Sequence, residues 1–281
     1  MRKPQAYAPT TAAQHRSQIV KLLHANSRSR NLWDVFSDFV EMGALAFANK
    51  VDLAQFDERE NRYLRIVKRY SPEEVSRFCE MLAHLTNAMH LGPDDVLGKV
   101  FSELELGNSA RGQFFTPYEV CRLMAQMKFR DADELQQVIN QRGYVTVHEP
   151  ACGAGAMIIA MADTFHHMGI NYQQNLHVVA QDVDSRAVHM AYLQLTLMHV
   201  PAIIILGNTL TLEQREVWYT PAHVLGNWKR KLSQGYLEGS ELDPANLRKS
   251  TSEDLIEQMG LLFPTEAEVC EELPMLDAYG T

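Results

Sequence analysis

Three short apolar runs in the second half of the chain alternate with segments that are long enough to form helices. The runs cover residues 144–147, 177–180 and 202–206, and the longer segments cover residues 156–168 and 185–200. Strands joined by helix-length connections pair in parallel, because the chain must cross the sheet before the next strand begins. The pattern therefore predicts an α/β fold with three parallel strands and right-handed connections.

The first hundred residues have a different periodicity, in which apolar residues recur three and four positions apart. Between Trp33 and Phe47 they form one stripe along a helix. Residues 71–74 supply a capping Ser, a Pro at the first helical position and a Glu three residues after the cap, so a further helix is expected to start there. These patterns predict an N-terminal helical domain over residues 1–105.

The distribution of charge separates a C-terminal segment from the rest of the chain. Residues 236–281 contain eleven acidic and two basic residues, so this segment accounts for the whole net charge of -9. Residues 1–235 are balanced, and a nucleic-acid surface would have to be local. We therefore expect a sheet domain over residues 106–235 and an acidic, mobile tail over residues 236–281, where hydrophobic periodicity weakens.

One local cluster of basic residues coincides with the second helix predicted in the first hundred residues. It could form a surface for nucleic acid, or it could belong to a solvated helix face that neighbouring acids balance, and the second interpretation is favoured. The basic residues are Arg59, Arg62, Arg65, Lys68 and Arg69, and the acids are Asp57, Glu58 and Glu60.

Several classes of protein are disfavoured by what the sequence lacks. It has no apolar stretch of roughly 18 to 20 residues and no signal-peptide core, which predicts a cytoplasmic protein without membrane contact. The four cysteines have no CxxC spacing, and the histidines form no HExxH, so no metal site is expected. Neither a GxxxxGK[ST] loop nor a GxSxG elbow is present.

A candidate ligand site follows from the ends of the first two predicted strands. The first strand leads into small residues that include Gly153 and Gly155, which let a ligand approach the backbone closely. The second strand ends at Asp182, where a carboxylate can hold the ribose hydroxyls of a nucleotide-like cofactor. Glycines at a strand end also serve tight helix packing, and Asp184 is expected to cap the next helix.

Four sequence motifs, taken in their order along the chain, make the prediction of this ligand site more specific. They are GQFFTPYEV at 112–120, VHEPACGAGA at 147–156, AQDVDSRAV at 180–188 and LGNTL at 206–210. Together they resemble the N6-adenine DNA methyltransferases that use S-adenosylmethionine, especially the modification subunits of type I restriction-modification systems, over about residues 75–210. The resemblance implies a Rossmann-like class I methyltransferase sheet behind an N-terminal helical domain.

The resemblance also implies which residues bind the cofactor. The Phe-Thr-Pro segment would hold its methionine end, the Gly-rich segment would wrap the methionine moiety, and a carboxylate would bind the ribose. Cys152 would be present for its small size, and an Asn after the third strand would lie beside the adenine amino group. The implied residues are Phe115, Thr116, Pro117, Glu149, Cys152, Gly153, Gly155, Asp182 and Asn208.

One family feature is missing. Such enzymes hold the extruded adenine with an Asn-Pro-Pro-aromatic loop after a fourth strand, and this sequence has no Asn-Pro-Pro or Asp-Pro-Pro. It also shows no clear apolar fourth strand between residues 209 and 235, which leaves three secure strands where the complete family sheet has seven. Tyr219, Asn227 and Trp228 are weak catalytic candidates, and packing of a helix over residues 222–232 against the half-size sheet is the favoured alternative.

Two functions remain open. The first is methyl transfer from S-adenosylmethionine to adenine in DNA, through an atypical loop or one completed by a protein partner or a second copy. The alternative is a catalytically inactive S-adenosylmethionine-binding protein with a regulatory or anti-restriction role, whose acidic tail could mimic DNA. Methylation of a small molecule or a protein is a weaker third option.

Overall fold

The computed structural model describes residues 9–104 and 115–247 of the chain. Residues 112–114 of the first motif and residues 248–281 of the acidic tail lie outside the described residues. The N-terminal part contains α1 (Ala12–Asn26), α2 (Leu32–Ala48), a 3-10 turn (Leu53–Gln55), α3 (Phe56–Val67), α4 (Pro72–His90) and α5 (Val96–Glu103). The second part contains α6 (Tyr118–Lys128), α7 (Ala132–Arg142), β1 (Val145–Glu149), α8 (Ala156–His167), α9 (Tyr172–Asn175), β2 (Leu176–Asp182), α10 (Ser185–Leu197), β3 (Ala202–Asn208), β4 (Glu213–Tyr219), α11 (Pro221–Leu225), α12 (Trp228–Gln234) and α13 (Pro244–Leu247).

The sheet has the strand order β1-β2-β3-β4 among the described residues. The first three strands are parallel, with Val147 opposite Val178 and Ala180 opposite Ile204, so the three predicted parallel strands are confirmed. The fourth strand corrects our prediction, because β4 pairs antiparallel with β3 within the region where we expected none. Its sequence, EQREVWY, is too polar to be recognised as a strand of a buried sheet.

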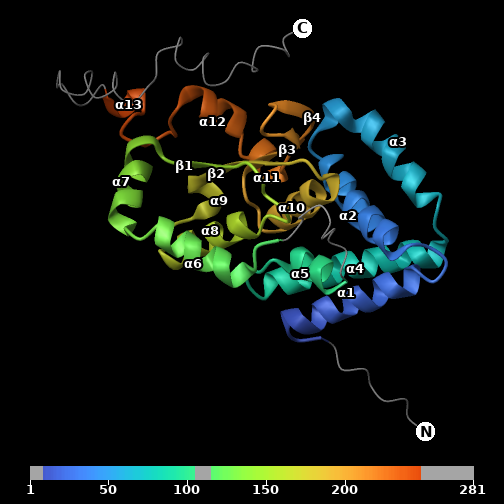
Figure 1. Ribbon diagram of the computed structural model, residues 1–281. Helices are drawn as coiled ribbons and strands as arrows, with labels where there is room; N and C mark the ends of the chain where they lie inside the picture. The colour runs from blue at the N-terminus through green and yellow to red at the C-terminus, as the bar shows by residue number, and fades with distance from the viewer. Residues whose placement is uncertain (1–8, 105–114, 248–281) are drawn as a thin grey trace.

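Helix α10 lies between the sheet and the N-terminal helices. It contacts β2 and β3 on one side and α2, α4 and α5 on the other (Figure 1). Gly43 of α2 allows the close approach, since a Cβ there would lie 3.0 Å from the Leu193 side chain. The buried apolar residues of the helices and of the sheet form one continuous cluster. The division at residue 105 stays a prediction.

Helix α3 docks on β4 through its basic residues. Arg59 is 4% exposed, and it pairs with Asp52 at 2.8 Å and lies over the ring of Trp218 at 4.4 Å. Arg62 pairs with Glu216 of β4 at 3.0 Å. The solvated face that we expected holds for the exposed Arg65 but is wrong for these two residues, because β4 supplies their partners.

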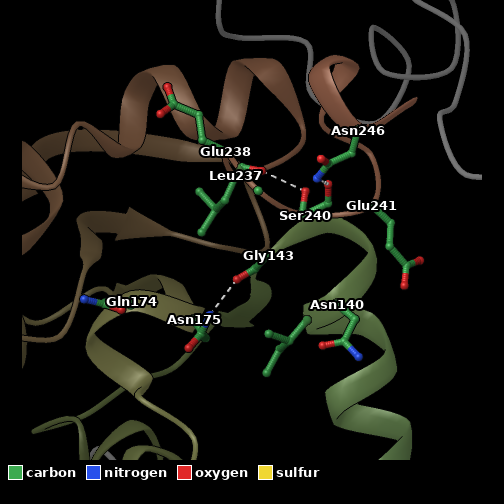
Figure 2. A pocket seen from close by; sticks show the side chains of 11 residues that line it. Asn140, Gly143, Gln174, Asn175, Leu237, Glu238, Ser240, Glu241 and Asn246 are labelled. Atoms are coloured by element: carbon green, nitrogen blue, oxygen red, sulfur yellow. Dashed lines mark hydrogen bonds between the residues drawn. The ribbon is translucent and has the colours of Figure 1, made fainter. Parts of the chain in front are cut away.

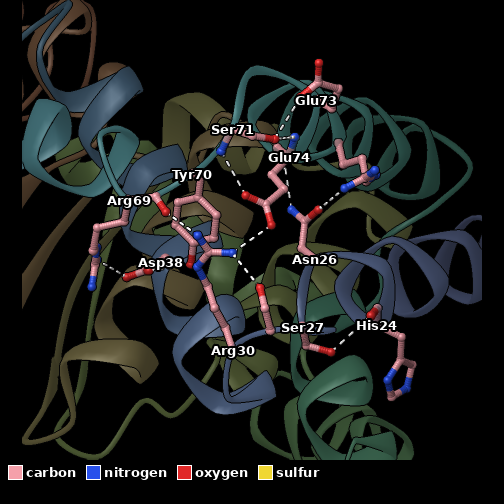
Figure 3. Close-up of polar contacts among 12 residues, drawn as sticks. His24, Asn26, Ser27, Arg30, Asp38, Arg69, Tyr70, Ser71, Glu73 and Glu74 are labelled. Atoms are coloured by element: carbon pink, nitrogen blue, oxygen red, sulfur yellow. Dashed lines mark hydrogen bonds and ion pairs between the residues drawn. The ribbon is translucent and has the colours of Figure 1, made fainter.

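Polar contacts also fix the connections among α1, α2, α3 and α4 (Figure 3). Arg30 pairs with Glu74 at 2.7 Å and lies over the ring of Tyr70 at 4.5 Å. The Tyr70 hydroxyl donates to Asp38 at 2.6 Å. Ser71 and Glu74 form the capping box predicted for α4. These contacts add polar links to the apolar core that the four helices share.

The segment after α12 packs on the end of α7. The amides of Leu237, Glu241 and Leu242 donate to three carbonyls at the C-terminus of α7, at 2.8 to 3.0 Å. Together with Asn140 and Asn175 the segment lines a pocket of about 620 Å³ at the amino-terminal ends of β1 and β2 (Figure 2). The described part of the predicted tail, residues 236–247, therefore has a defined docking position.

The helix predicted over residues 222–232 is interrupted. Gly226 and Asn227 separate α11 from α12, and Asn227 has a φ of 53° in the left-handed region, which ends the first helix. Within residues 9–104 and 115–247, every helix is too short or too polar to cross a membrane.

Three buried histidines should make stability depend on pH. His177 and His223 lie 2.9 Å apart, and burial lowers the pKa of both imidazoles. Burial and then the charge of Arg62 lower the pKa of His189 to about 3. These rings stay neutral in the folded protein at pH 5, whereas the unfolded chain takes up protons below its ordinary pKa of about 6.5.

Acidification from pH 7 to pH 5 should therefore lower the free energy of unfolding by about 2 kcal/mol for each of these histidines. Urea unfolding at the two pH values measures this loss. The His189→Leu variant should lose about 2 kcal/mol less than the wild type, while a His148→Leu variant, changed at an exposed ring, should lose as much as the wild type. Equal losses in all three proteins would contradict the prediction.

Candidate functional site

The turn between β1 and α8 forms the Gly-rich loop, residues 150–155. Gly153 and Gly155 have φ values of 54° and 93°, a backbone region that favours glycine. The Cys152 amide donates to the carbonyl of Gln181 in β2 at 2.9 Å, which ties the loop to the neighbouring strand. Gly155 begins α8 without a side-chain cap, so the first-turn amides of this helix are available to an acceptor.

Asp182, the last residue of β2, faces this loop. One carboxylate oxygen accepts from the Gly153 amide at 2.9 Å, and the other accepts from the Asp184 amide at 2.9 Å. Asp184 itself caps α10 by accepting from the Arg186 amide, as predicted. The predicted glycine and the predicted carboxylate therefore meet at the carboxyl ends of the parallel strands.

Phe115 lies over the Gly-rich loop. A Cβ on Gly153 would be 3.0 Å from its ring, so the close approach requires glycine. On its other side Phe115 packs against Phe101 of α5, with ring centroids 5.0 Å apart. Thr116 and Pro117 follow as exposed residues, and Pro117 starts α6. The two sequence motifs that were expected to share a site are thus in contact.

The remaining predicted cofactor residues lie at the same edge of the sheet. Glu149 ends β1 and accepts from the Ala151 amide at 3.3 Å. Asn208 ends β3, and its side-chain oxygen accepts from the Leu210 amide at 2.9 Å. The Thr209 hydroxyl donates to the carbonyl of Pro150 at 2.7 Å, which joins the end of β3 to the Gly-rich loop.

Burial raises the pKa of two titratable groups at the Gly-rich loop, Cys152 and Asp182. Desolvation, followed by the charge of Asp182, raises the pKa of the Cys152 thiol well above its ordinary value. Cys152 is therefore a protonated thiol with no nucleophilic character, in agreement with a role as a small residue. Burial also raises the pKa of Asp182, against its two backbone hydrogen bonds. An added hydrogen-bond donor would favour the charged carboxylate.

The three weak catalytic candidates lie near the amino-terminal ends of the parallel strands, at the other end of the sheet from the Gly-rich loop. Tyr219 ends β4 opposite Ile203 at the amino-terminal end of β3. Trp228 is buried, with its ring 5.1 Å from that of His177 at the start of β2. Asn227 connects α11 to α12. The structure does not bring these residues to the Gly-rich loop, and Trp228 packs in the interior as in our favoured alternative.

Several residues that contact the region around the Gly-rich loop were missed in the sequence, among them Phe101, Thr209 and Arg215. Phe101 comes from the N-terminal helices, and no local pattern reveals a contact that is made across the fold. Thr209 belongs to a motif that we quoted, but its hydroxyl reaches the loop only because β3 ends beside β1 and β2. Arg215 of β4 likewise donates to the carbonyl of Val183, after Asp182, at 2.7 Å.

Comparison with known proteins identifies this region. No curated protein matches the chain. The family model of N-6 DNA methylases matches residues 94–231. This range contains all four sequence motifs and every strand of the described sheet. The family predicted from the resemblance is confirmed. Residues 94–231 of this chain belong to the N-6 DNA methylase family.

Proposed function

We propose that the carboxyl ends of β1 and β2 bind S-adenosylmethionine in the manner of a Rossmann-like class I methyltransferase. The observation that carries this proposal is the meeting of three predicted groups, since the Gly153 amide lies 2.9 Å from Asp182 and directly below Phe115. A glycine without a side chain, a carboxylate and an aromatic ring are suited to a nucleoside with a charged amino-acid end.

The residues present fit this group. Asp182 has two carboxylate oxygens within reach of backbone donors and would take the ribose hydroxyls. Next to it, the buried amide nitrogen of Gln181 has no hydrogen-bond partner among the described residues, so a ligand acceptor could satisfy it. Glu149, Cys152 and Gly155 complete the loop that would hold the methionine end, with Thr116 and Pro117 at its rim.

Methyl transfer to adenine in DNA requires more than this site. The cofactor would supply an activated methyl group, and the protein would have to hold the extruded base with a stacking ring and oriented acceptors. Tyr219, Asn227 and Trp228 cannot do this from the other end of the sheet. We therefore infer that methylation needs a loop contributed by a protein partner or by a second copy of the chain.

Two surfaces that no described residue covers support completion by another chain. Val120, Leu123, Met124 and Met127 form one face of α6 at helical spacing, and each is 45% to 62% exposed. Strand β1 pairs only with β2 among the described strands, so backbone groups on its other edge can accept a further strand. Apolar surface at helical spacing is typical of an interaction site.

The second candidate function is a regulatory or anti-restriction protein that binds S-adenosylmethionine without transferring its methyl group. The same observations support it, since the groups that would bind the cofactor lie together, while the part of the chain that the structure describes places no base-holding groups beside them. The acidic tail, which could mimic DNA, favours this role further. In either role the helical domain of residues 1–105 would support the sheet domain of residues 106–235.

The cofactor assignment predicts a loss of binding in the Asp182→Ala variant. A carboxylate that shares two hydroxyls makes charge-assisted hydrogen bonds, each worth roughly 1.5 to 3 kcal/mol, so affinity should fall about ten- to a hundredfold. Calorimetric titration with S-adenosylmethionine measures this. Asp133→Ala, which removes an exposed acid of α7, serves as the control and should bind like the wild type.

The assignment of Asp182 would be rejected if a wild type that binds S-adenosylmethionine and the Asp182→Ala variant had equal affinity. A wild type without measurable binding would reject the proposed function as a whole. Far-ultraviolet circular dichroism of each variant shows whether the fold is retained.

The missing base-holding groups predict that the chain alone binds S-adenosylmethionine but transfers little or no methyl group to DNA. The measurement is incorporation of labelled methyl groups into adenine of mixed-sequence DNA. Incorporation at several turnovers per minute would contradict this expectation. In that case, loss of activity in Tyr219→Ala, Asn227→Ala or Trp228→Ala would identify the 219–228 segment as an unusual catalytic loop.

A further inference from the structure

Gln194 is a polar residue in the buried helix α10, and it lies where the N-terminal helices meet the Gly-rich loop. Its side chain is fully buried. The amide nitrogen donates to the Asp95 carboxylate and to the carbonyl of Ala154, each at 2.8 Å. The amide oxygen accepts from the Leu97 backbone at 3.0 Å. A single side chain therefore connects the start of α5 to the Gly-rich loop.

Asp95 is held rigidly for this contact. It is 3% exposed and caps α5 by accepting from the Gly98 amide at 2.9 Å. A Cβ on Gly98 would lie 2.0 Å from the carboxylate, so glycine alone leaves room for it there. The carboxylate thus has a fixed position against which Gln194 is oriented.

The carbonyl that Gln194 binds belongs to the middle of the loop. Because a peptide bond is planar, fixing the Ala154 carbonyl also fixes the direction of the Gly155 amide, which donates to the Cys152 carbonyl at 2.8 Å. Removal of Gln194 would leave this carbonyl without its side-chain donor and the buried Asp95 with the Gly98 amide alone, which is costly inside a protein. The loop would then lose the constraint that keeps its amides directed as they are.

A second contact joins α5 to the same loop. Phe101 packs on Phe115, and Phe115 lies over Gly153. Helix α5 therefore reaches the loop on two sides, by hydrogen bonds through Gln194 and by ring packing through Phe115. The N-terminal helices are thus linked to the Gly-rich loop itself through these two side chains, in addition to packing on the helix that covers the sheet.

We propose that Gln194, held by Asp95, is a positioning residue that sets the shape of the Gly-rich loop and couples it to α5. The coupling to S-adenosylmethionine rests on the proposed function, whereas the coupling between loop and helix does not. Binding of the cofactor should stabilise α5, and disturbance of α5 should weaken binding, because coupling between two sites is reciprocal.

Hydrogen exchange without ligand tests the coupling between loop and helix. In Gln194→Leu, which keeps the size of the side chain but removes its hydrogen bonds, amides of residues 152–156 and 97–98 should exchange at least tenfold faster. Tyr70→Phe is the matched control, because it removes a buried hydrogen bond to Asp38 far from the loop. It should leave exchange of the loop unchanged.

The conservative Asp95→Asn variant tests whether the hydrogen bonds of this side chain or its negative charge hold the loop. Asp95→Asn keeps an acceptor for Gly98 and Gln194 and should retain slow exchange in the loop, whereas Asp95→Ala should accelerate it as Gln194→Leu does. This pair also carries the test if Gln194→Leu fails to fold. Equal loop exchange in Asp95→Asn and Asp95→Ala would overturn the proposal.

Titration with S-adenosylmethionine tests the coupling to the ligand. We expect about tenfold weaker binding by Gln194→Leu and unchanged binding by Tyr70→Phe. Ligand-induced slowing of exchange at residues 97–98 should occur in the wild type and in Tyr70→Phe but not in Gln194→Leu. Wild-type exchange in Gln194→Leu overturns the coupling even if the cofactor binds. Faster loop exchange in a protein that binds no cofactor supports the coupling and rejects the proposed function.

Discussion

The burial of the central ten residues of helix α10 is the constraint on which the rest of the fold depends. Every residue from Ala187 to Thr196 is buried, so this helix has protein on all sides. A helix of this kind is stable only when other elements cover each of its faces. The sheet covers one face and the N-terminal helices cover another, so neither part has a complete apolar core without the other.

The two ends of the parallel strands have different chemistry as a result. At the amino-terminal ends, His177, His223 and Trp228 fill the interior with rings, and the segment after α12 closes the surface. At the carboxyl ends, small residues and backbone amides surround Asp182. The first end holds the sheet together, and the second leaves polar groups within reach of a ligand.

The sequence was most informative where local pattern and structure coincide. Apolar runs separated by helix-length segments predicted β1, β2 and β3, and the order of four motifs predicted which residues gather at their carboxyl ends. These features could be predicted because β2 and β3 are buried apolar runs that pack on α10, the helix that joins them in sequence. The capping box of α4 was equally local.

Long-range partners explain what could not be predicted. Strand β4 is polar because residues 213–215 are exposed and because Glu216 pairs with Arg62, which lies 154 residues earlier in the sequence. Neither Glu216 nor Arg62 alone indicates this contact. Arg59 resembled a surface charge because its partners, Asp52 and Trp218, are brought to it only by the fold. Contacts of α5 with the Gly-rich loop have the same origin.

The hydrogen bond between Gly153 and Asp182 has a consequence for recognition. It is made entirely by groups of this chain, and the loop that carries it is also held at Pro150, Cys152 and Ala154. A loop that becomes ordered only on binding weakens affinity by the conformational entropy it loses. Here that entropy is lost when the chain folds, so the loop is preorganised and a ligand encounters a surface whose shape is already set.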